Sequence, residues 1–95
     1  MIGFVWDPRK NTMNRKKHGI SFEEARDVFY DENAIRYFDP DHSEDEDRFL
    51  MLGMSTRLRV LVVSHFYMEN DTTIRIISAR KATKKEEAVY WRERS

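Results

Sequence analysis

Three strand-forming stretches decide the fold: RFLMLGM (residues 48–54), RVLVVSHFY (59–67) and TIRIISA (73–79). Each is rich in the apolar, β-branched or aromatic side chains that pack well in sheets. The connections between them are short and polar, STR (55–57) and END (69–71), which suits hairpins. We therefore predict three successive strands that pair antiparallel.

A basic helix precedes these strands. Asp7 is a typical N-cap, Pro8 suits the first helical position, and Gly19 suits the position just past a helix end. We therefore predict a helix from Pro8 to about His18. Met13 is its only strongly apolar residue, and six of its residues carry basic side chains: Arg9, Lys10, Arg15, Lys16, Lys17 and His18. Such a helix is mostly solvated or faces an anion.

Capping signals and short apolar runs give the remaining elements. Two capping boxes open two further helices: Ser21 with Glu24, in a helix that ends near residue 30, and Thr83 with Glu86. Residues 2–6 and 34–38 suit two more strands. The predicted order is β-α-α-β-β-β-β-α. This is an α+β fold in which helices pack on one antiparallel sheet, with residues 1–95 as one domain.

Composition narrows the class of protein. The 95 residues are 40% hydrophobic and 36% charged, which is enough apolar content for one small core, and there is no cysteine to form a disulfide. We find no membrane-spanning run and no signal-peptide pattern, so we expect a cytoplasmic protein. The net charge is zero, but residues 31–48 carry −6 and residues 49–95 carry +4. The layout of charge on the folded surface therefore decides whether nucleic acid binds.

Side chains alternate across a strand, so the sequence also assigns them to faces. Four residues of the 59–67 strand share the face that we expect to pack under the helices: Val60, Val62, Ser64 and Phe66. In the next strand, Arg75 and Arg80 should point to opposite faces unless a bulge intervenes. Arg80 lies just before the helix that Thr83 opens. Free backbone N–H groups at that helix start, together with a guanidinium, would suit a phosphate.

The three histidines, His18, His42 and His65, follow no metal-binding spacing, so we predict no metal site and no cofactor. We expect the six carboxylates of residues 39–47 to form a solvated loop. His18 is either a cation that interacts with its helix dipole or an acid/base group at an anion-binding surface. His65 is either a half-buried strand histidine or a group of the active site.

Two further groups of residues leave alternatives open. One group is either a basic surface beside the first helix or ordinary solvated charge: Arg59, Arg80, Lys81, Lys84 and Lys85. The other either stacks on nucleobases or packs in the core or an interface: Tyr67, Tyr90 and Trp91. Because residues 89–91 are consecutive and apolar, they cannot all face one core. At least one of them should be exposed, which suggests contact with a protein partner.

Three blocks of the sequence resemble the BrnT family of bacterial type II toxins. The first is F-x-W-D-x-x-K-x-x-x-N-x-x-K-H-G-I-x-F-x-E-A over residues 4–25. The second is D-P-D-H-S over residues 39–43, followed by Arg48 and Gly53. The third is R-I-I-S-A-R-x-A-T-x-x-E-x-x-x-Y over residues 75–90. The blocks occur in the family's order and span nearly the whole chain.

The resemblance implies a RelE-like ribonuclease fold and a toxin that arrests translation by cutting RNA. It also implies a cognate DNA-binding antitoxin that neutralises the toxin in a hetero-oligomer, and a complex that represses its own operon by binding operator DNA. We expect metal-independent cleavage, in which the ribose 2′-OH attacks the adjacent phosphorus and the 5′-oxygen leaves. This reaction needs a base, an acid and cations for the developing charge.

The site hypothesis that accompanies this mechanism has two parts. The predicted catalytic residues are His18, His65, Arg80 and Lys17, with proton transfer assigned to one of the histidines. The predicted substrate-binding residues are Lys10, Arg48, Arg59 and Tyr90. The hypothesis requires folding to bring these distant side chains into one cleft. The alternative is a non-catalytic module that binds the antitoxin or nucleic acid in operon repression, where the cations serve affinity alone.

Overall fold

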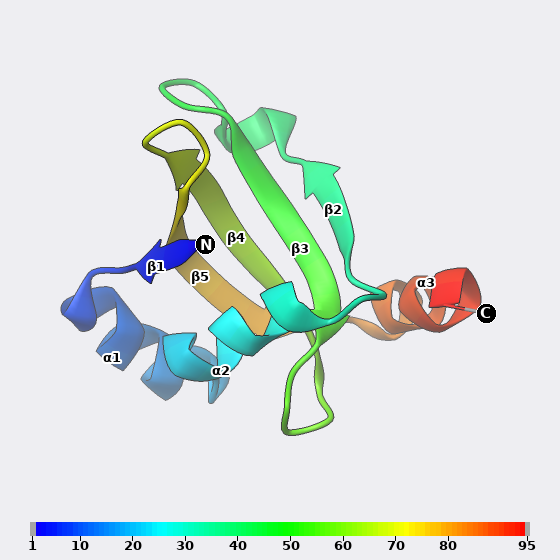
Figure 1. Ribbon diagram of the computed structural model, residues 1–95. Helices are drawn as coiled ribbons and strands as arrows, with labels where there is room; N and C mark the ends of the chain where they lie inside the picture. Colours follow the sequence, from blue (N-terminus) through cyan, green and yellow to red (C-terminus); the bar gives the residue numbers. More distant parts are fainter. Residues whose placement is uncertain (1, 95) are drawn as a thin grey trace.

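Residues 2–94, which the computed structural model describes, contain a single mixed sheet of five strands (Figure 1). In sequence order the strands are β1 (Gly3–Val5), β2 (Ile35–Phe38), β3 (Arg48–Met54), β4 (Val60–Met68) and β5 (Thr73–Lys81). Their order across the sheet is β1-β5-β4-β3-β2. The strands from β2 to β5 pair antiparallel, and β1 runs parallel to β5. The predicted α+β fold and element order are confirmed, with one parallel pair added to the antiparallel sheet.

The helices begin at the predicted capping residues, and the first also ends as predicted. The second ends at Asp27, and a 3-10 turn takes up the rest of its predicted span to residue 30. The helices are α1 (Pro8–His18), α2 (Phe22–Asp27) and α3 (Lys84–Arg94), with 3-10 turns η1 (Val28–Tyr30) and η2 (Pro40–His42). The Asp7 side chain accepts from the backbone N–H of Arg9, and Gly19 ends α1 with a positive φ of 71°. A side chain beyond Cβ is disfavoured in that conformation, which explains the glycine. Among residues 2–94, no helix has the length and apolar character needed to cross a membrane.

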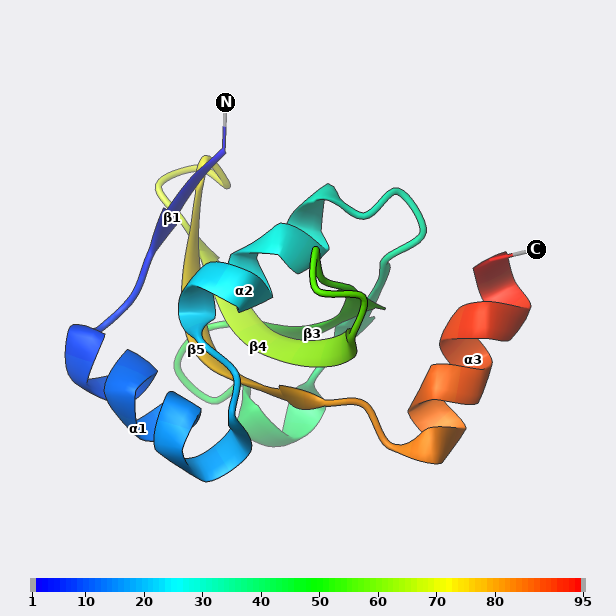
Figure 2. The same cartoon turned by 90° about the horizontal axis from the view of Figure 1, so that it is seen from below.

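The sheet has an apolar core on each of its two faces. On the face that α1 and α2 cover, here called the α2 side, Leu61 and Val63 are fully buried with the apolar residues of α2. On the opposite face, Val60 and Val62 pack with Tyr90 of α3. The prediction that the Val60–Phe66 set packs under the helices holds for Val60 and Val62, which lie under α3, while the alternate set of β4 packs under α2. Figure 2 shows α2 and α3 in different positions around the sheet.

Two buried asparagines attach α1 to the rest of the molecule. Asn14 pairs with the backbone of β5, where its amide donates to the carbonyl of Ala79 (2.8 Å) and its Oδ1 accepts from the N–H of Ala79 (3.1 Å). The Oδ1 of Asn11 accepts from the backbone N–H of Phe22 (2.9 Å). Met13, by contrast, is 68% exposed. The helix therefore docks through hydrogen bonds that its sparse apolar content did not predict.

A β-bulge interrupts the pairing of β4 with β5. Ser64 lies opposite Ser78, but the next residue, His65, lies opposite Ile76. Ile77 is therefore an extra residue in β5, with no counterpart in β4. A bulge of one residue reverses the side-chain alternation from that point on.

The bulge changes which arginines share a face. Residues paired across neighbouring strands lie on the same face. Arg80 pairs with Val62, and Arg75 pairs with Phe66, which is on the same face of β4 as Val62. Both arginines therefore lie on the face opposite α2. Without the bulge, as sequence parity alone indicates, they would lie on opposite faces.

Candidate nucleic-acid interface

Three rows of paired residues cross the sheet from β3 through β4 to β5 on the face opposite α2. The rows are Arg48–Phe66–Arg75, Leu50–Ser64–Ser78 and Leu52–Val62–Arg80. We call the part of this face that carries Arg48, Arg75 and Arg80 the arginine face. Neighbouring strands lie about 4.8 Å apart, so the backbones of Arg48 and Arg75 are about 10 Å apart. This spacing lets the long side chains converge on one extended ligand.

The guanidinium groups of Arg48 and Arg75 differ in their surroundings. Arg48 is held by the acidic loop, since Glu46 lies 3.4 Å from its Nη2, and its Nε is buried without a hydrogen-bond partner. Arg75 makes no ion pair or side-chain hydrogen bond with any part of the chain that the structure describes. Both therefore retain donors for an external acceptor. Buried or half-buried donors of this kind gain most from an anionic ligand.

Arg80 is paired within the chain. Its Nη1 and Nη2 donate to the two carboxylate oxygens of Glu86, at 2.7 and 3.0 Å. The same carboxylate accepts from the backbone N–H of Thr83 (2.8 Å), and the Thr83 hydroxyl accepts from the N–H of Glu86 (3.2 Å). Hydrogen bonds from Arg80 lower the pKa of Glu86 to about 2, against the effect of partial burial.

The donors of the phosphate site predicted at Arg80 are therefore in place, but the carboxylate of Glu86 already accepts hydrogen bonds from them. A guanidinium and a helix N-terminus converge there, as the sequence indicates, and the Glu86 side chain bridges them. An incoming phosphate has to share Arg80 with this carboxylate. The capping box signalled Glu86 in the sequence, but its pairing with Arg80 depends on how β5 leads into α3.

His65 does not join the arginine face. It lies on the α2 side with 0% of its surface exposed, and aromatic rings surround it at centroid distances of 4.7 Å (Phe29) and 5.4 Å (Tyr67). Its Nδ1 lies 3.0 Å from the carbonyl oxygen of Val63, and its Nε2 is buried without a partner. Burial lowers its pKa to about 4. The prediction that His65 belongs to one cleft with Arg80 is corrected: it is a neutral core residue, more deeply buried than expected.

The predicted residues of α1 lie at the edge of the sheet. Asn14 fixes the helix against Ala79 of β5. Lys10, Lys17 and His18 lie four residues before and three and four residues after Asn14, so they share its side of the helix. Lys10 and Lys17 are exposed and His18 is half-buried. These groups border β5 beside the arginine face, rather than lying on it.

Arg59 has a structural contact in place of the predicted substrate contact. It forms an ion pair with Glu24, which is only 6% exposed, and its Nη2 donates to the carbonyl oxygen of Gly19 (3.3 Å). The hydrogen bond from Arg59 to Glu24 raises the pKa of the guanidinium. Arg59 therefore holds the β3–β4 hairpin to α2, on the side away from the arginine face.

Tyr90 likewise anchors the fold. It is 0% exposed, and its hydroxyl donates to the Oδ2 of Asp31 (2.6 Å), which also accepts from the backbone N–H of Met54 (2.8 Å). Burial and the hydrogen bond to Asp31 raise the pKa of Tyr90 to about 12. The prediction that Tyr90 contacts substrate is corrected, because no part of it reaches the surface. Trp91 is the exposed aromatic of α3, at 47%.

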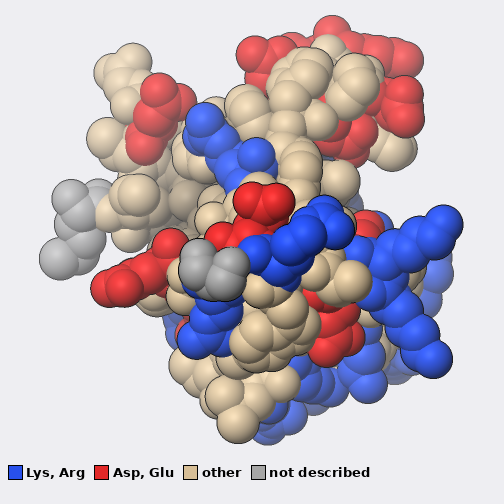
Figure 3. Space-filling model, turned by 90° about the vertical axis from the view of Figure 1, so that its right-hand side faces the viewer, with Lys and Arg blue, Asp and Glu red and all other residues tan. Residues whose placement is uncertain are grey.

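The charges of the molecule are separated in space. The loop of residues 39–47 carries six carboxylates, and the β4–β5 turn adds Glu69 and Asp71. Figure 3 shows the largest group of Asp and Glu side chains at the top, with others in the centre and at the left, while Lys and Arg side chains lie mainly in the lower and right-hand parts of the view. The acidic loop adjoins Arg48, since Glu46 contacts that arginine, so its carboxylates partly offset the cations at that end of the sheet and leave the far end more open to a polyanion.

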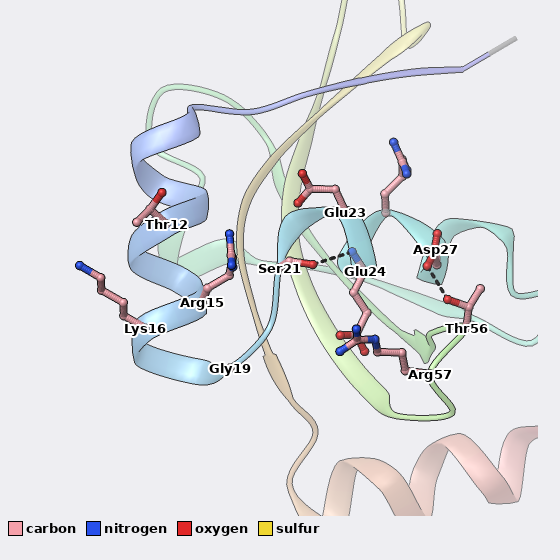
Figure 4. A pocket seen from close by; sticks show the side chains of 11 residues that line it. Thr12, Arg15, Lys16, Gly19, Ser21, Glu23, Glu24, Asp27, Thr56 and Arg57 are labelled. Atoms are coloured by element: carbon pink, nitrogen blue, oxygen red, sulfur yellow. Dashed lines mark hydrogen bonds between the residues drawn. The ribbon is translucent and has the colours of Figure 1, made fainter.

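A large open cavity of about 830 Å³ lies apart from the arginine face, between α1, α2 and the β3–β4 hairpin (Figure 4). Its lining includes four cations: Arg15, Lys16, Arg26 and Arg57. The cations do not converge, since Figure 4 shows Lys16 projecting away from α2. The carboxylates in the lining are already hydrogen-bonded, as Asp27 is to Thr56 at 2.7 Å. No pattern in the sequence pointed to this cavity, because its walls come from three separate segments.

Comparisons with known proteins bear on both the family and the fold. The family model described as "Ribonuclease toxin, BrnT, of type II toxin-antitoxin system" matches residues 6–86. The structure is similar to the crystal structure of the Brucella abortus ribonuclease toxin, BrnT, with a TM-score of 0.64 and 21% identity, covering 88% of this chain and 100% of that one. A search of curated proteins finds no match. At this identity the structural likeness shows the fold, and the family model shows the family.

Proposed function

The chain belongs to the BrnT family of ribonuclease toxins from type II toxin–antitoxin systems, and from that premise we propose that it cuts RNA on the arginine face. The observation that carries the proposal is the bulge in β5, which sets Arg75 on the same face as Arg80 and Arg48. Three guanidinium groups on one face, with Ser64, Ser78 and Phe66 between them, suit a single-stranded phosphate backbone.

The proposed reaction breaks one phosphodiester bond without a metal ion. The ribose 2′-oxygen forms a bond to the adjacent phosphorus as its proton passes to a base, and the bond from phosphorus to the 5′-oxygen breaks as that oxygen takes a proton from an acid. The products are a 2′,3′-cyclic phosphate and a 5′-hydroxyl. Negative charge builds up on the phosphoryl oxygens in the transition state, and Arg48, Arg75 and Arg80 are placed to stabilise it.

His18 is the predicted histidine that fits the proton-transfer role. It is half-buried at the β5 edge, next to Lys17, whereas His65 is fully buried on the α2 side. An imidazole can serve as a general base or as a general acid in such a transfer. Lys10 and Lys17 extend the cationic surface around the same edge and would hold the RNA strand beyond the scissile bond.

The type II family also implies an antitoxin partner. We propose that a cognate DNA-binding antitoxin neutralises the chain by covering the arginine face, and that the complex binds operator DNA through the antitoxin. Exposed aromatic residues support a protein contact near α3, where Trp91 is 47% exposed. Co-expression with the neighbouring antitoxin gene should abolish growth arrest. Growth arrest that persists in the presence of a stable complex would argue against neutralisation.

One observation favours the alternative of a non-catalytic nucleic-acid module. The arginine face itself holds no histidine among its paired rows, and Arg80 is already matched by Glu86. A surface of this kind can bind a polyanion without cutting it. Binding would then weaken steeply with salt, as counterions are released.

An RNA cleavage assay with the purified protein in excess EDTA separates the two functions. The enzyme should convert a labelled RNA to fragments that end in a 2′,3′-cyclic phosphate, and should leave a fully 2′-O-methylated copy intact. Cleavage that appears only when a divalent cation is added contradicts the metal-independent mechanism. Salt-dependent binding with no cleavage under any condition identifies the non-catalytic module.

A further inference from the structure

A small apolar recess of about 240 Å³ opens beside the arginine face, between α3 and the strands β2, β3 and β4. Six side chains line it: Tyr37, Leu50, Leu52, Val62, Glu86 and Val89. Leu50 and Leu52 follow Arg48 on the same face of β3, and Val62 lies opposite Arg80. The recess therefore adjoins the arginine face. Arg48 lies on the same strand as Leu50 and Leu52, and Arg80 lies on the strand next to Val62.

We propose that this recess holds one nucleobase of the bound RNA and selects bases that carry an exocyclic amino group, adenine, cytosine or guanine, over uracil. The inference rests on the proposed function, because it assumes that RNA lies on the arginine face. It adds a specificity determinant, Glu86, that the proposed cleavage chemistry does not use.

The walls of the recess suit a flat ring. Leucine and valine side chains from β3, β4 and α3 form its floor and sides, and Tyr37, which is 41% exposed, supplies an aromatic edge on β2. Unpaired bases bind proteins by inserting between apolar side chains and stacking on aromatic rings. A free phosphate or sugar has no comparable apolar surface to bury here.

Glu86 gives the recess its chemical selectivity. It is the only ionisable acid among the lining residues that the structure describes, and its hydrogen bonds to Arg80 and Thr83 keep it ionised. A carboxylate offers about four acceptor sites and no donor. Arg80 uses two of them and the Thr83 N–H uses a third, so one acceptor site remains.

The free acceptor discriminates between bases by their exposed edges. Adenine, cytosine and guanine each present an amino group that can donate to it. Uracil presents the carbonyl oxygen O4 where cytosine has its amino group, and its one donor on that edge, N3–H, lies between two carbonyl oxygens that repel the carboxylate. Because this hydrogen bond to a charged acceptor forms with the amino bases and not with uracil, a preference of about tenfold over uracil is expected.

The neighbouring cations favour a nucleotide over a protein side chain as the occupant. A base in the recess is covalently tied to phosphates on both sides, and Arg48 and Arg80 lie next to the recess on β3 and β5. An apolar side chain of a partner protein would fill the recess but would give no acceptor to the donors of these arginines that Glu46 and Glu86 leave unused. Charge complementarity therefore selects RNA.

The direct test measures binding of 2′-O-methyl oligonucleotides, which cannot be cut because they lack the attacking hydroxyl. Labelled A, C and U homopolymers of equal length are titrated with the wild-type chain, and affinity is read by fluorescence anisotropy. The A and C polymers should bind about tenfold more tightly than the U polymer. Equal affinity for all three overturns the inference.

Two variants locate the preference in the recess. Val89→Phe fills the recess from α3 and should remove the preference for A and C while leaving the salt dependence of binding in place. Ala88→Phe is the matched control, because Ala88 is exposed on the same helix and does not line the recess. A preference that survives Val89→Phe, or that Ala88→Phe also removes, overturns the assignment.

Glu86→Gln tests the chemistry without altering the shape, and glutamine also serves in a capping box. The change frees Arg80, so affinity should rise for every polymer. Because the amide can also donate to O4, the U polymer should gain most and the A-to-U affinity ratio should fall toward one. An unchanged ratio overturns the role of Glu86. Absence of binding to any polymer at low salt is a different result, since it refutes the proposed function itself.

Discussion

The two faces of the sheet contain opposite chemistry, although β3, β4 and β5 build both of them. On the α2 side, α2 closes over Leu61 and Val63, and the histidine of that face, His65, is held neutral by burial. On the other face, α3 covers only the end near Val60, so the arginines keep contact with water. An ionisable group is therefore a core residue or a functional residue according to the face on which it lies.

The difference shows most clearly at two neighbours in β4. Ser64 and His65 are adjacent in the chain, yet Ser64 lies in the row between Leu50 and Ser78, while His65 lies among aromatic rings under η1. His65 could transfer a proton in a reaction, but the fold buries it completely. A reactive side chain thus contributes to a site only when strand register turns it toward the open face.

The largest expected effect is the loss of RNA cleavage when an arginine of the arginine face is removed. Single Arg48→Ala, Arg75→Ala and Arg80→Ala variants should each lower kcat/KM for RNA cleavage by about 100-fold, the usual cost of removing one preorganised donor to a developing charge. The control is Arg57→Ala, an exposed arginine at the tip of the β3–β4 hairpin, which should cut RNA like the wild type. If all three arginine variants cut RNA as fast as that control, the assignment of the site to this face is wrong.

Protonation of His65, on the α2 side of the sheet, should make the stability of the fold depend on pH. The pKa of His65 falls from its ordinary value of 6.5 to about 4 in the folded chain. Between these values the unfolded chain binds the proton more tightly, so the free energy of unfolding should fall as pH drops from 6.5 to 4, by on the order of 3 kcal/mol in total. Chemical denaturation at several pH values measures this.

His65→Leu is the matched variant for the pH experiment. It keeps an apolar side chain of similar size in the core and removes the titrating ring, so its stability should depend less on pH across that range. If the wild type and the variant lose stability in parallel, other groups cause the acid sensitivity and the buried histidine does not.

Local signals predicted most of the fold, because they act within a few residues. Asp7, Ser21 and Gly19 cap helices through hydrogen bonds and backbone conformations that depend on near neighbours. The attachment of α1 was not predictable in the same way, since Asn14 binds Ala79, which is 65 residues away in sequence. An asparagine in a basic helix has no feature that distinguishes a docking residue from a solvated one.

The site was predicted less well than the fold, for a single geometric reason. Alternation along β5 separates Arg75 from Arg80, and one extra residue at Ile77 brings them to the same face. Whether a strand contains a bulge depends on its pairing partner, so the sequence of β5 alone does not contain the answer. Arg48 and Arg80 lie on one face, as the site hypothesis requires, while His65, Arg59 and Tyr90 lie elsewhere because their burial depends on packing.

A smaller effect, on stability alone, should come from the docking of α1. Asn14→Ala leaves the buried N–H and carbonyl of Ala79 without their partner, which should lower the free energy of unfolding by about 1–3 kcal/mol. Met13→Ala is the control on the same helix and should cost almost nothing, since Met13 is 68% exposed. Equal losses in the two variants would mean that apolar packing, and not the asparagine, attaches the helix.

The smallest effect should come from Tyr90→Phe, which removes one hydroxyl from beneath α3. The variant keeps the buried ring but loses the hydrogen bond to Asp31, and Asp31 still accepts from the backbone N–H of Met54. The free energy of unfolding should therefore fall by about 1 kcal/mol, while RNA cleavage in the folded protein stays at the wild-type rate. If cleavage instead falls as far as in Arg75→Ala, the hydroxyl contacts RNA. In that case α3 must move away from the sheet when substrate binds, and the partial cover over the arginine face is a mobile one.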